Sequence, residues 1–266
     1  MLYLLSYSFF QNAIVGALLA SILCGMIGTY IVTRRMVFVS GGIAHASLGG
    51  IGLGAFFHFP PLWGAAIVAL LSGVGIQELK RKIEMREDAA IAMIWTLGMS
   101  IGLICAFLTP SFVSSLDSYL FGSILTIATS DLYIMGGIVV VSAIYFIFYI
   151  RQIIAVAFDS NFSKSAGINV EQIELVMMIL IALTIISCLH MMGIILVISL
   201  LSIPQTTANL LTNDYCIMMG LSVLISLIGS IGGLFISAYY SIPSGVCIII
   251  ILIALYVLVY ATKKIF

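Results

Sequence analysis

The chain has 266 residues, of which 63% are hydrophobic and only 8% are charged. Charged residues make up about a quarter of an ordinary soluble domain, so this composition excludes that class of protein and indicates one that crosses a lipid bilayer several times. The ten Lys and Arg residues balance ten Asp and Glu residues, and this net charge gives no indication of nucleic-acid binding. We therefore expect a multi-pass membrane protein with no nucleic-acid partner.

Nine apolar segments, bounded by Gly, Pro or charged residues, predict membrane helices. They lie near residues 8–32, 36–57, 61–79, 89–109, 131–150, 173–190, 193–211, 215–237 and 244–262. We expect an all-α, polytopic helical bundle that forms one transmembrane domain over residues 1–266. Residues 173–211 leave one alternative open, because a re-entrant pair there would reduce nine crossings to eight. Residues 110–130 predict an outward loop followed by a short interfacial or re-entrant helix.

The basic residues predict the orientation in the membrane. All ten fall in alternate connections between the segments: Arg34 and Arg35; Lys80, Arg81, Lys82 and Arg86; Arg151 and Lys164; Lys263 and Lys264. By the positive-inside rule these connections are cytoplasmic, so the amino terminus lies outside and the carboxyl terminus inside. Aromatic residues stand near predicted helix ends, as in an interfacial belt: Trp63, Tyr133, Tyr215, Tyr239 and Tyr240.

The segment from 36 to 57 contains one ionisable residue, His45, among apolar and glycine-rich neighbours. At ~1.5 Å per residue the segment is about 33 Å long, which matches a hydrocarbon core of roughly 30 Å and leaves His45 near the midplane. Small residues around it allow other helices to approach closely: Gly41, Gly42, Ala46, Gly49, Gly50 and Gly54. An ionisable residue at that depth indicates a functional role, and the alternative is a packing histidine bonded to a neighbouring carbonyl.

Pro204 falls late in its apolar segment and interrupts the helical hydrogen-bond ladder. The side chains of Gln205, Thr206 and Thr207 follow directly and are able to satisfy the backbone groups that the proline frees. Two interpretations stay open for this position, a hinge for alternating access and a static kink.

The sizeable cytoplasmic connection in this topology runs from 151 to 172. Its core, from Phe158 to Ala166, predicts a short amphipathic helix, with Asp159 near the amino end and Gly167 as the stop. Such a helix suits docking to a motor protein, whereas many cytoplasmic loops contain one helical turn that binds nothing.

Motifs for enzymatic chemistry are missing from the sequence. It has neither G-x-x-x-x-G-K-[ST] nor H-E-x-x-H, so it predicts no P-loop and no zinc-protease site. Ser47 lies two residues from His45 and cannot share its helical face, which argues against a serine nucleophile with that base. The five cysteines lack metal-ligand spacing and are interpreted as small core residues: Cys24, Cys105, Cys188, Cys216 and Cys247. We expect a transport subunit and not an enzyme.

Six motifs in order resemble the membrane-spanning permease subunits of bacterial ABC importers for zinc and manganese. They are SGGIAHASLGG (40–50), REDAAIAMIWTLGMSIG (86–102), SYLFGSIL (118–125), AFDSNFSKSAGIN (157–169), GIILVISLLSIPQTTANLL (193–211) and IPSG (242–245). The resemblance implies an all-helical permease in the bacterial inner membrane that forms a homodimer around the translocation path. It also implies a separate cytoplasmic ABC ATPase pair and an extracytoplasmic metal-binding protein. Residues 157–169 match the family's coupling helix, with Phe158, Asp159, Ala166 and Gly167 as the residues that contact the ATPase.

The same resemblance bears on the metal. His45 matches the histidine of a D-x-x-x-H pair whose carboxylate would fall at Gly41, and a second acid of the family would fall at Ser241. Both acids are missing here. His58 and Asp117 are further candidate ligands near the outer surface, although His58 and His190 are as well explained as interfacial residues that touch headgroups. Imidazoles with few acids suit zinc better than manganese or iron, so we expect zinc, with no permanently bound cofactor.

Two other functions are compatible with parts of this pattern. A permease for iron chelates or vitamin B12 is also all-helical and ABC-driven, but its wider path would not need a midplane histidine. An intramembrane enzyme would need paired catalytic groups at one depth, and the sequence predicts no acidic partner at the level of His45.

Overall fold

The computed structural model describes residues 7–109, 122, 124 and 127–265, and the predicted outer segment 110–130 lies largely outside these. Every long element among the described residues is a helix. Their bounds are α1 (Ser8–Thr33), α2 (Val37–Phe56), α3 (Pro61–Lys82), α4 (Glu87–Leu108), α6 (Thr129–Phe158), α7 (Ser160–Ser165), α8 (Val170–Met192), α9 (Ile194–Leu200), α10 (Ile203–Leu211), α11 (Tyr215–Tyr240) and α12 (Ser244–Ile265). The all-α prediction is confirmed.

Nine segments of the described chain are long and apolar enough to cross a membrane, and they match the nine predicted ones. The segment Ile194–Leu211 counts as one of them and holds both α9 and α10. The main difference is α6, which continues to Phe158 and not to residue 150. No glycine or proline follows residue 150 until the turn at Asp159, so nothing in the local sequence ends the helix earlier.

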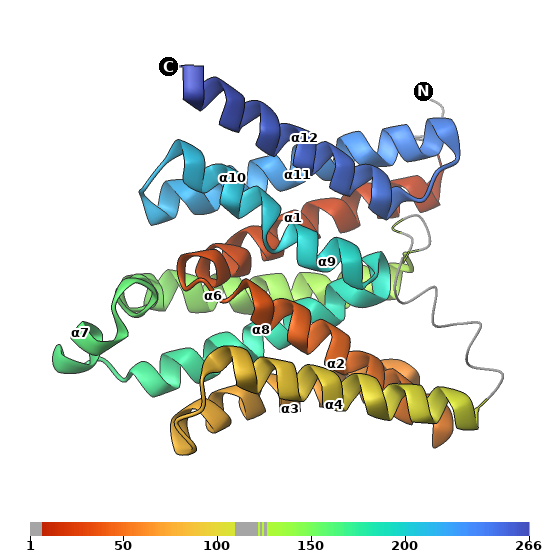
Figure 1. Cartoon of the computed structure of the whole chain (residues 1–266). Helices are drawn as coiled ribbons and strands as arrows, with labels where there is room; N and C mark the ends of the chain where they lie inside the picture. The colour runs from red at the N-terminus through yellow and green to blue at the C-terminus, as the bar shows by residue number, and fades with distance from the viewer. Residues whose placement is uncertain (1–6, 110–121, 123, 125–126, 266) are drawn as a thin grey trace.

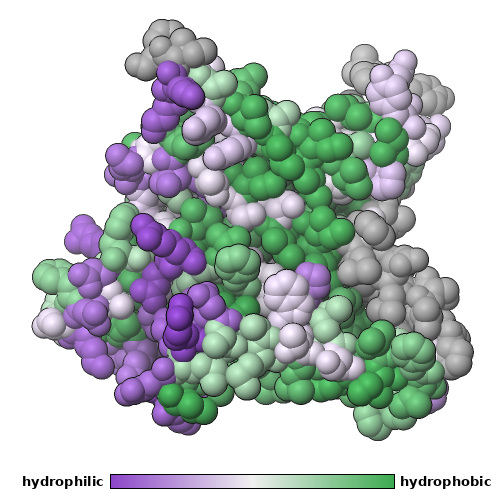
Figure 2. Space-filling model, viewed as in Figure 1, coloured by the Kyte–Doolittle hydropathy of each residue, from purple (hydrophilic) through white to green (hydrophobic). Residues whose placement is uncertain are grey.

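The long helices lie roughly side by side, with α7 at one end of the bundle (Figure 1). The last turns of α1, α3, α6 and α12 reach this same end, which we call the α7 end. Hydrophilic residues gather there, and hydrophobic residues form the band beside it (Figure 2). The arrangement agrees with the predicted segregation of basic residues. The predicted aromatic belt is confirmed in part, because Trp63 and Tyr133 are exposed by 68% and 79%. The assignment of Tyr215 to the belt is wrong, because this side chain is only 5% exposed.

Helix α2 packs between α3 and α4, and glycines make these contacts close (Figure 1). A Cβ atom placed on Gly49 would overlap the Gly98 carbonyl of α4, and one placed on Gly50 would overlap the Gly64 carbonyl of α3. Backbone against backbone is possible only without side chains, as in other membrane helix pairs. The predicted role of the small residues around His45 is therefore confirmed.

The break between α9 and α10 follows from Pro204, which lacks the N–H that would reach Leu200, four residues earlier. The Gln205 side chain replaces it: Nε2 donates to the Leu200 carbonyl oxygen at 3.0 Å and to the Cys24 carbonyl oxygen of α1 at 2.7 Å. Gly28 of α1 leaves the room that the amide occupies, because a Cβ there would overlap it. The predicted rescue of the freed backbone by Gln205 is confirmed.

Candidate functional site

His45 is the ninth residue of α2 and lies near the middle of that helix. Its imidazole stacks face to face on the indole of Trp95 in α4, with ring centroids 4.6 Å apart and planes 6° from parallel. The side chain is partly exposed, but its Nδ1 atom is buried and has no hydrogen-bond partner. The carbonyl bond expected of a packing histidine is therefore not present at Nδ1.

The position one helical turn before His45 is open. A Cβ atom on Gly41 would have a single neighbour within 4 Å, the Cδ1 atom of Ile198 in α9 at 3.8 Å, which is an ordinary contact. The bundle thus has space for a side chain where the resemblance expects a carboxylate. The other missing acid would fall at Ser241, which is exposed and caps α11 in the left-handed region with φ of 54°.

The remaining predicted metal residues do not join His45. His58 is exposed in the connection between α2 and α3, with φ of 59°, and about 17 Å of helix lies between His45 and the end of α2. Asp117 lies outside the described residues. Among the residues that the structure describes, no group of three or more His, Cys, Asp and Glu side chains is placed to hold a metal ion. Ser47 donates to the Ala44 carbonyl oxygen at 2.6 Å and so does not serve His45.

At the α7 end, the predicted cytoplasmic helix is present but shorter than expected. It covers Ser160–Ser165, and not Phe158 to Ala166. Asp159 sets this boundary, because its extended backbone (φ −148°, ψ 100°) cannot belong to a helix. Its carboxylate accepts hydrogen bonds from the backbone N–H groups of Asn161 at 3.0 Å and Phe162 at 2.9 Å. Phe158 therefore ends α6 and does not begin α7.

The carboxyl end of α7 follows the prediction. Ala166 is the C-cap, and Gly167 has φ of 82°, a conformation that favours glycine and stops a helix. Phe158 and Phe162 on either side of the Asp159 cap expose 65% and 69% of their surface. These two rings give the α7 end an apolar, accessible face beside its polar residues.

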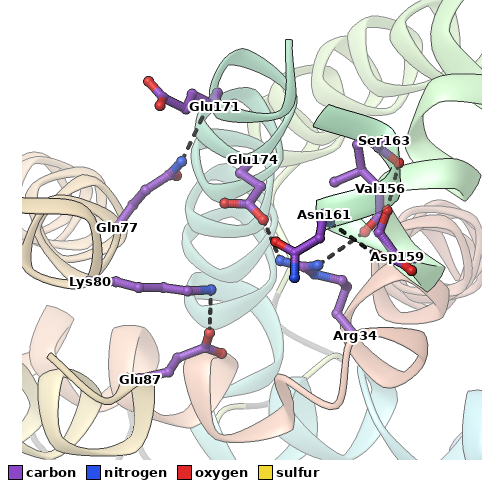
Figure 3. Close-up of polar contacts among 10 residues, drawn as sticks. All are labelled: Arg34, Gln77, Lys80, Glu87, Val156, Asp159, Asn161, Ser163, Glu171 and Glu174. Atoms are coloured by element: carbon purple, nitrogen blue, oxygen red, sulfur yellow. Dashed lines mark hydrogen bonds and ion pairs between the residues drawn. The ribbon is translucent and has the colours of Figure 1, made fainter. Parts of the chain in front are cut away.

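Arg34 joins the two helices that flank α7 (Figure 3). It caps the carboxyl end of α1, its Nη1 donates to the Val156 carbonyl oxygen of α6 at 3.0 Å, and its Nη2 pairs with the Glu174 carboxylate of α8. The two side chains of the ion pair are only 12% and 18% exposed. One guanidinium thus holds the helix before α7 and the helix after it.

A second set of polar contacts joins α3 to α8 and α4 (Figure 3). Gln77 donates to the Glu171 carbonyl oxygen at 3.3 Å, and Lys80 pairs with Glu87 of α4 at 2.7 Å. Arg81 pairs with the Glu171 carboxylate at 3.2 Å. All of these residues except Glu87 border a groove of about 550 Å³ between the end of α3, α7 and the start of α8.

Two contact pairs between helices escaped the sequence analysis. Trp95 is 50 residues from His45, and Glu174 is 140 residues from Arg34, so neither pair shares a local spacing. For Arg34 the available signal was the presence of two adjacent basic residues, Arg34 and Arg35, at a helix end. This signal indicated the topology but did not identify a partner.

Comparison with known proteins covers nearly the whole chain. Residues 6–263 match the ABC 3 transport family. The chain is 38% identical to the uncharacterized membrane protein slr2045 of Synechocystis sp., over 98% of this chain and 92% of that protein. It is 30% identical to the manganese transport system membrane protein MntC of Halalkalibacterium halodurans, over 97% of this chain and 88% of that protein.

A solved structure agrees with these relatives. PsaBC from Streptococcus pneumoniae in complex with Fab matches with a TM-score of 0.85 and 26% identity, over 97% of this chain and 92% of the matched chain. Fold, sequence and helix order thus lead to one assignment. The chain belongs to the ABC 3 transport family.

Proposed function

We propose that this chain is the permease subunit of an ATP-driven importer for divalent metal ions in the bacterial inner membrane. Two copies form the path, a cytoplasmic ABC ATPase pair drives it, and an extracytoplasmic protein delivers the metal. Family membership and the relative named as a manganese transport protein support the metal as cargo. The observation that carries the proposal is the imidazole of His45, which lies mid-helix with its Nδ1 atom unpartnered.

His45 acts as a transient ligand of the passing ion. Neutral imidazole binds transition metals through a ring nitrogen, and the copy in the partner subunit supplies a second one across the path. Without an acid at position 41 the ion's charge is only weakly compensated, so the site holds it loosely. A loose site suits a conduit, because an ion that is bound too tightly does not leave. His58 and Asp117, expected near the outer surface, are assigned to the entrance.

Zinc is the first candidate for the ion. Zinc accepts nitrogen ligands readily, whereas manganese takes more oxygen, and position 41, one helical turn before His45, is a glycine and not an acid. Manganese is the second candidate, because the relative in Halalkalibacterium halodurans is named as a manganese transport system protein.

The segment 157–169 couples the permease to its ATPase. Its exposed rings, Phe158 and Phe162, offer the apolar contact area, and the capped ends at Asp159 and Gly167 fix the short helix between them. Ala166 closes the helix and belongs to the same contact face. The groove between α3 and α7 lies directly beside this segment.

Uptake of radioactive zinc into proteoliposomes that contain the permease and its ATPase tests the proposal. His45→Ala should abolish uptake while ATPase association remains, and Ser47→Ala, two residues away on the same helix, should keep most of it. Gly41→Asp should increase the metal retained by the permease, because the position has space for the side chain. Wild-type uptake in His45→Ala at equal protein would overturn the role of His45. If excess manganese abolishes zinc uptake and is itself taken up, the second candidate is favoured.

A further inference from the structure

The imidazole of His45 lacks the support that metal-binding histidines usually have. A ligating histidine normally donates its second ring N–H to a carboxylate, a carbonyl or water, and this bond fixes the tautomer and the plane of the ring. In His45 the Nδ1 atom is buried and has no partner. Hydrogen bonding at this atom therefore does not orient the ring.

Trp95 provides the directional contact instead. The two rings are 4.6 Å apart and 6° from parallel, within the range of stable aromatic stacking. Rotation of the imidazole about its Cβ–Cγ bond would drive its edge into the indole face. The stack covers a face of the ring, and the indole leaves the ring's edge, where the nitrogen lone pairs lie, uncovered.

The backbone explains why the two rings meet. Gly49 lies one turn after His45, and Gly98 lies one turn after Trp95. These two glycines bring α2 and α4 into backbone contact, because a Cβ on either would overlap the other helix. The stacked pair thus sits beside the closest approach of the two helices, and its spacing is fixed by main chain.

The indole also bears on charge. An imidazole that binds a divalent ion becomes electron-poor, and the negative face of an aromatic ring attracts such a group, most strongly in tryptophan. Gly41, on the same face of α2 as His45, supplies no carboxylate to do this. We propose that Trp95 is the positioning residue of the path, which holds the His45 imidazole edge-on to the ion and offsets its charge by stacking.

This inference rests on the proposed function, since it assumes that His45 binds the ion. In transport assays with the ATPase present, Trp95→Leu should raise the KM for zinc about tenfold, a size between those of exposed and fully desolvated cation–π contacts, because both rings are partly exposed. The maximal rate and the ATPase activity should change much less. Trp95→Phe keeps an aromatic face and should recover most of the affinity, which a purely structural loss would not predict.

Tryptophan emission gives an independent measurement, because the chain contains only two tryptophans, Trp63 and Trp95. Trp63→Phe leaves Trp95 as the reporter in the full-length permease, held in a tryptophan-free amphipol. Cobalt(II), a zinc substitute that quenches nearby indoles, should quench this emission. The matched variant Trp95→Phe leaves Trp63, which is 68% exposed on α3, and its emission should not respond at the same cobalt concentration.

The decisive control adds His45→Ala to the Trp63→Phe variant and should remove the quenching. Equal quenching with and without His45, or an unchanged KM in Trp95→Leu, overturns the role of Trp95. Wild-type zinc uptake in His45→Ala alone overturns the proposed function itself. The two failures are therefore distinguished by separate variants.

Discussion

Around His45, in the middle of α2, the described structure has glycine contacts and one aromatic stack, and the Nδ1 atom of His45 is left without a hydrogen bond. Around Arg34, just before α2 begins, it has an ion pair to Glu174 and a hydrogen bond to Val156. Both residues carry nitrogen donors and both contact neighbouring helices. Arg34 uses two of its nitrogens, Nη1 and Nη2, and leaves its buried Nε without a partner, whereas the Nδ1 atom of His45 has no partner at all.

The difference matches two tasks. A group that binds and releases an ion has to keep its ligand atom unoccupied, and at His45 the contact that holds the ring is the stack on Trp95 and not a hydrogen bond at Nδ1. A group that carries force between helices has to be bonded at several points, because contacts that slip do not transmit movement. The proposed roles in ion passage and in coupling thus call for different local contacts.

The largest expected effect comes from the packing that holds the middle region. Gly50→Ala places a methyl group on the Gly64 carbonyl and within 2.8 Å of the Ala65 nitrogen, and backbone atoms cannot move aside. We expect a loss of about 3 kcal/mol or more in stability, measured as a large fall in Tm of the purified protein. Gly137→Ala on α6 is the control, because nothing lies within 4 Å of its new methyl group. Equal Tm values in the two variants would contradict this account of α2.

The next effect tests the α7 end. Arg34→Ala leaves the partly buried Glu174 carboxylate unpaired, at a cost of about 3 kcal/mol. Arg81→Ala breaks two more exposed pairs, with Glu78 and Glu171, and should cost less than about 1 kcal/mol. Because Arg34 joins both flanks of α7, its variant should also transport less zinc per ATP hydrolysed. The ratio of zinc uptake to ATP hydrolysis, measured in proteoliposomes, should fall for Arg34→Ala and stay unchanged for Arg81→Ala. Similar ratios in the two variants would contradict a role of Arg34 in coupling.

The smallest effect sharpens the boundary of α7. Asp159→Ala loses the acceptor of two backbone N–H groups, worth about 1 kcal/mol, so affinity for the ATPase should fall about fivefold. Gly167→Ala strains a backbone with φ of 82° by a similar amount. Ser165→Ala, which removes one exposed bond to the Asn161 carbonyl oxygen, is the neutral control. A pull-down with the purified ATPase measures the affinity of all three variants. Equal binding by all three would contradict a role of this segment in docking the ATPase.

Local rules predicted much of this architecture. Long apolar runs are decided by hydropathy alone, and the nine spans were recovered, with α6 extended because no breaking residue stops it before Asp159. The cap at Asp159, the stop at Gly167 and the rescue by Gln205 also follow from neighbours in the chain. Such features depend on residues within one or two helical turns.

The candidate site was predicted only in part. His45 was found because an ionisable residue in an apolar span is conspicuous, but its partner Trp95 comes from another helix and was not. Tyr215 was assigned to the interface from its place at a helix end, whereas packing buries it. Contacts between helices depend on rotation and tilt, which hydropathy does not fix.

The amide of Gln205 has a mechanical consequence for the joint between α9 and α10. An ordinary hydrogen bond of an α-helix joins two backbone groups, so a sharp bend in the helix breaks it. Here the donor to the Leu200 carbonyl oxygen is the Gln205 side chain, which has its own rotatable bonds, and the same amide donates to the Cys24 carbonyl oxygen of α1. A change in the angle between α9 and α10 would therefore require only that this side chain turn about its own bonds, and the amide would keep the Leu200 carbonyl paired and remain bonded to α1.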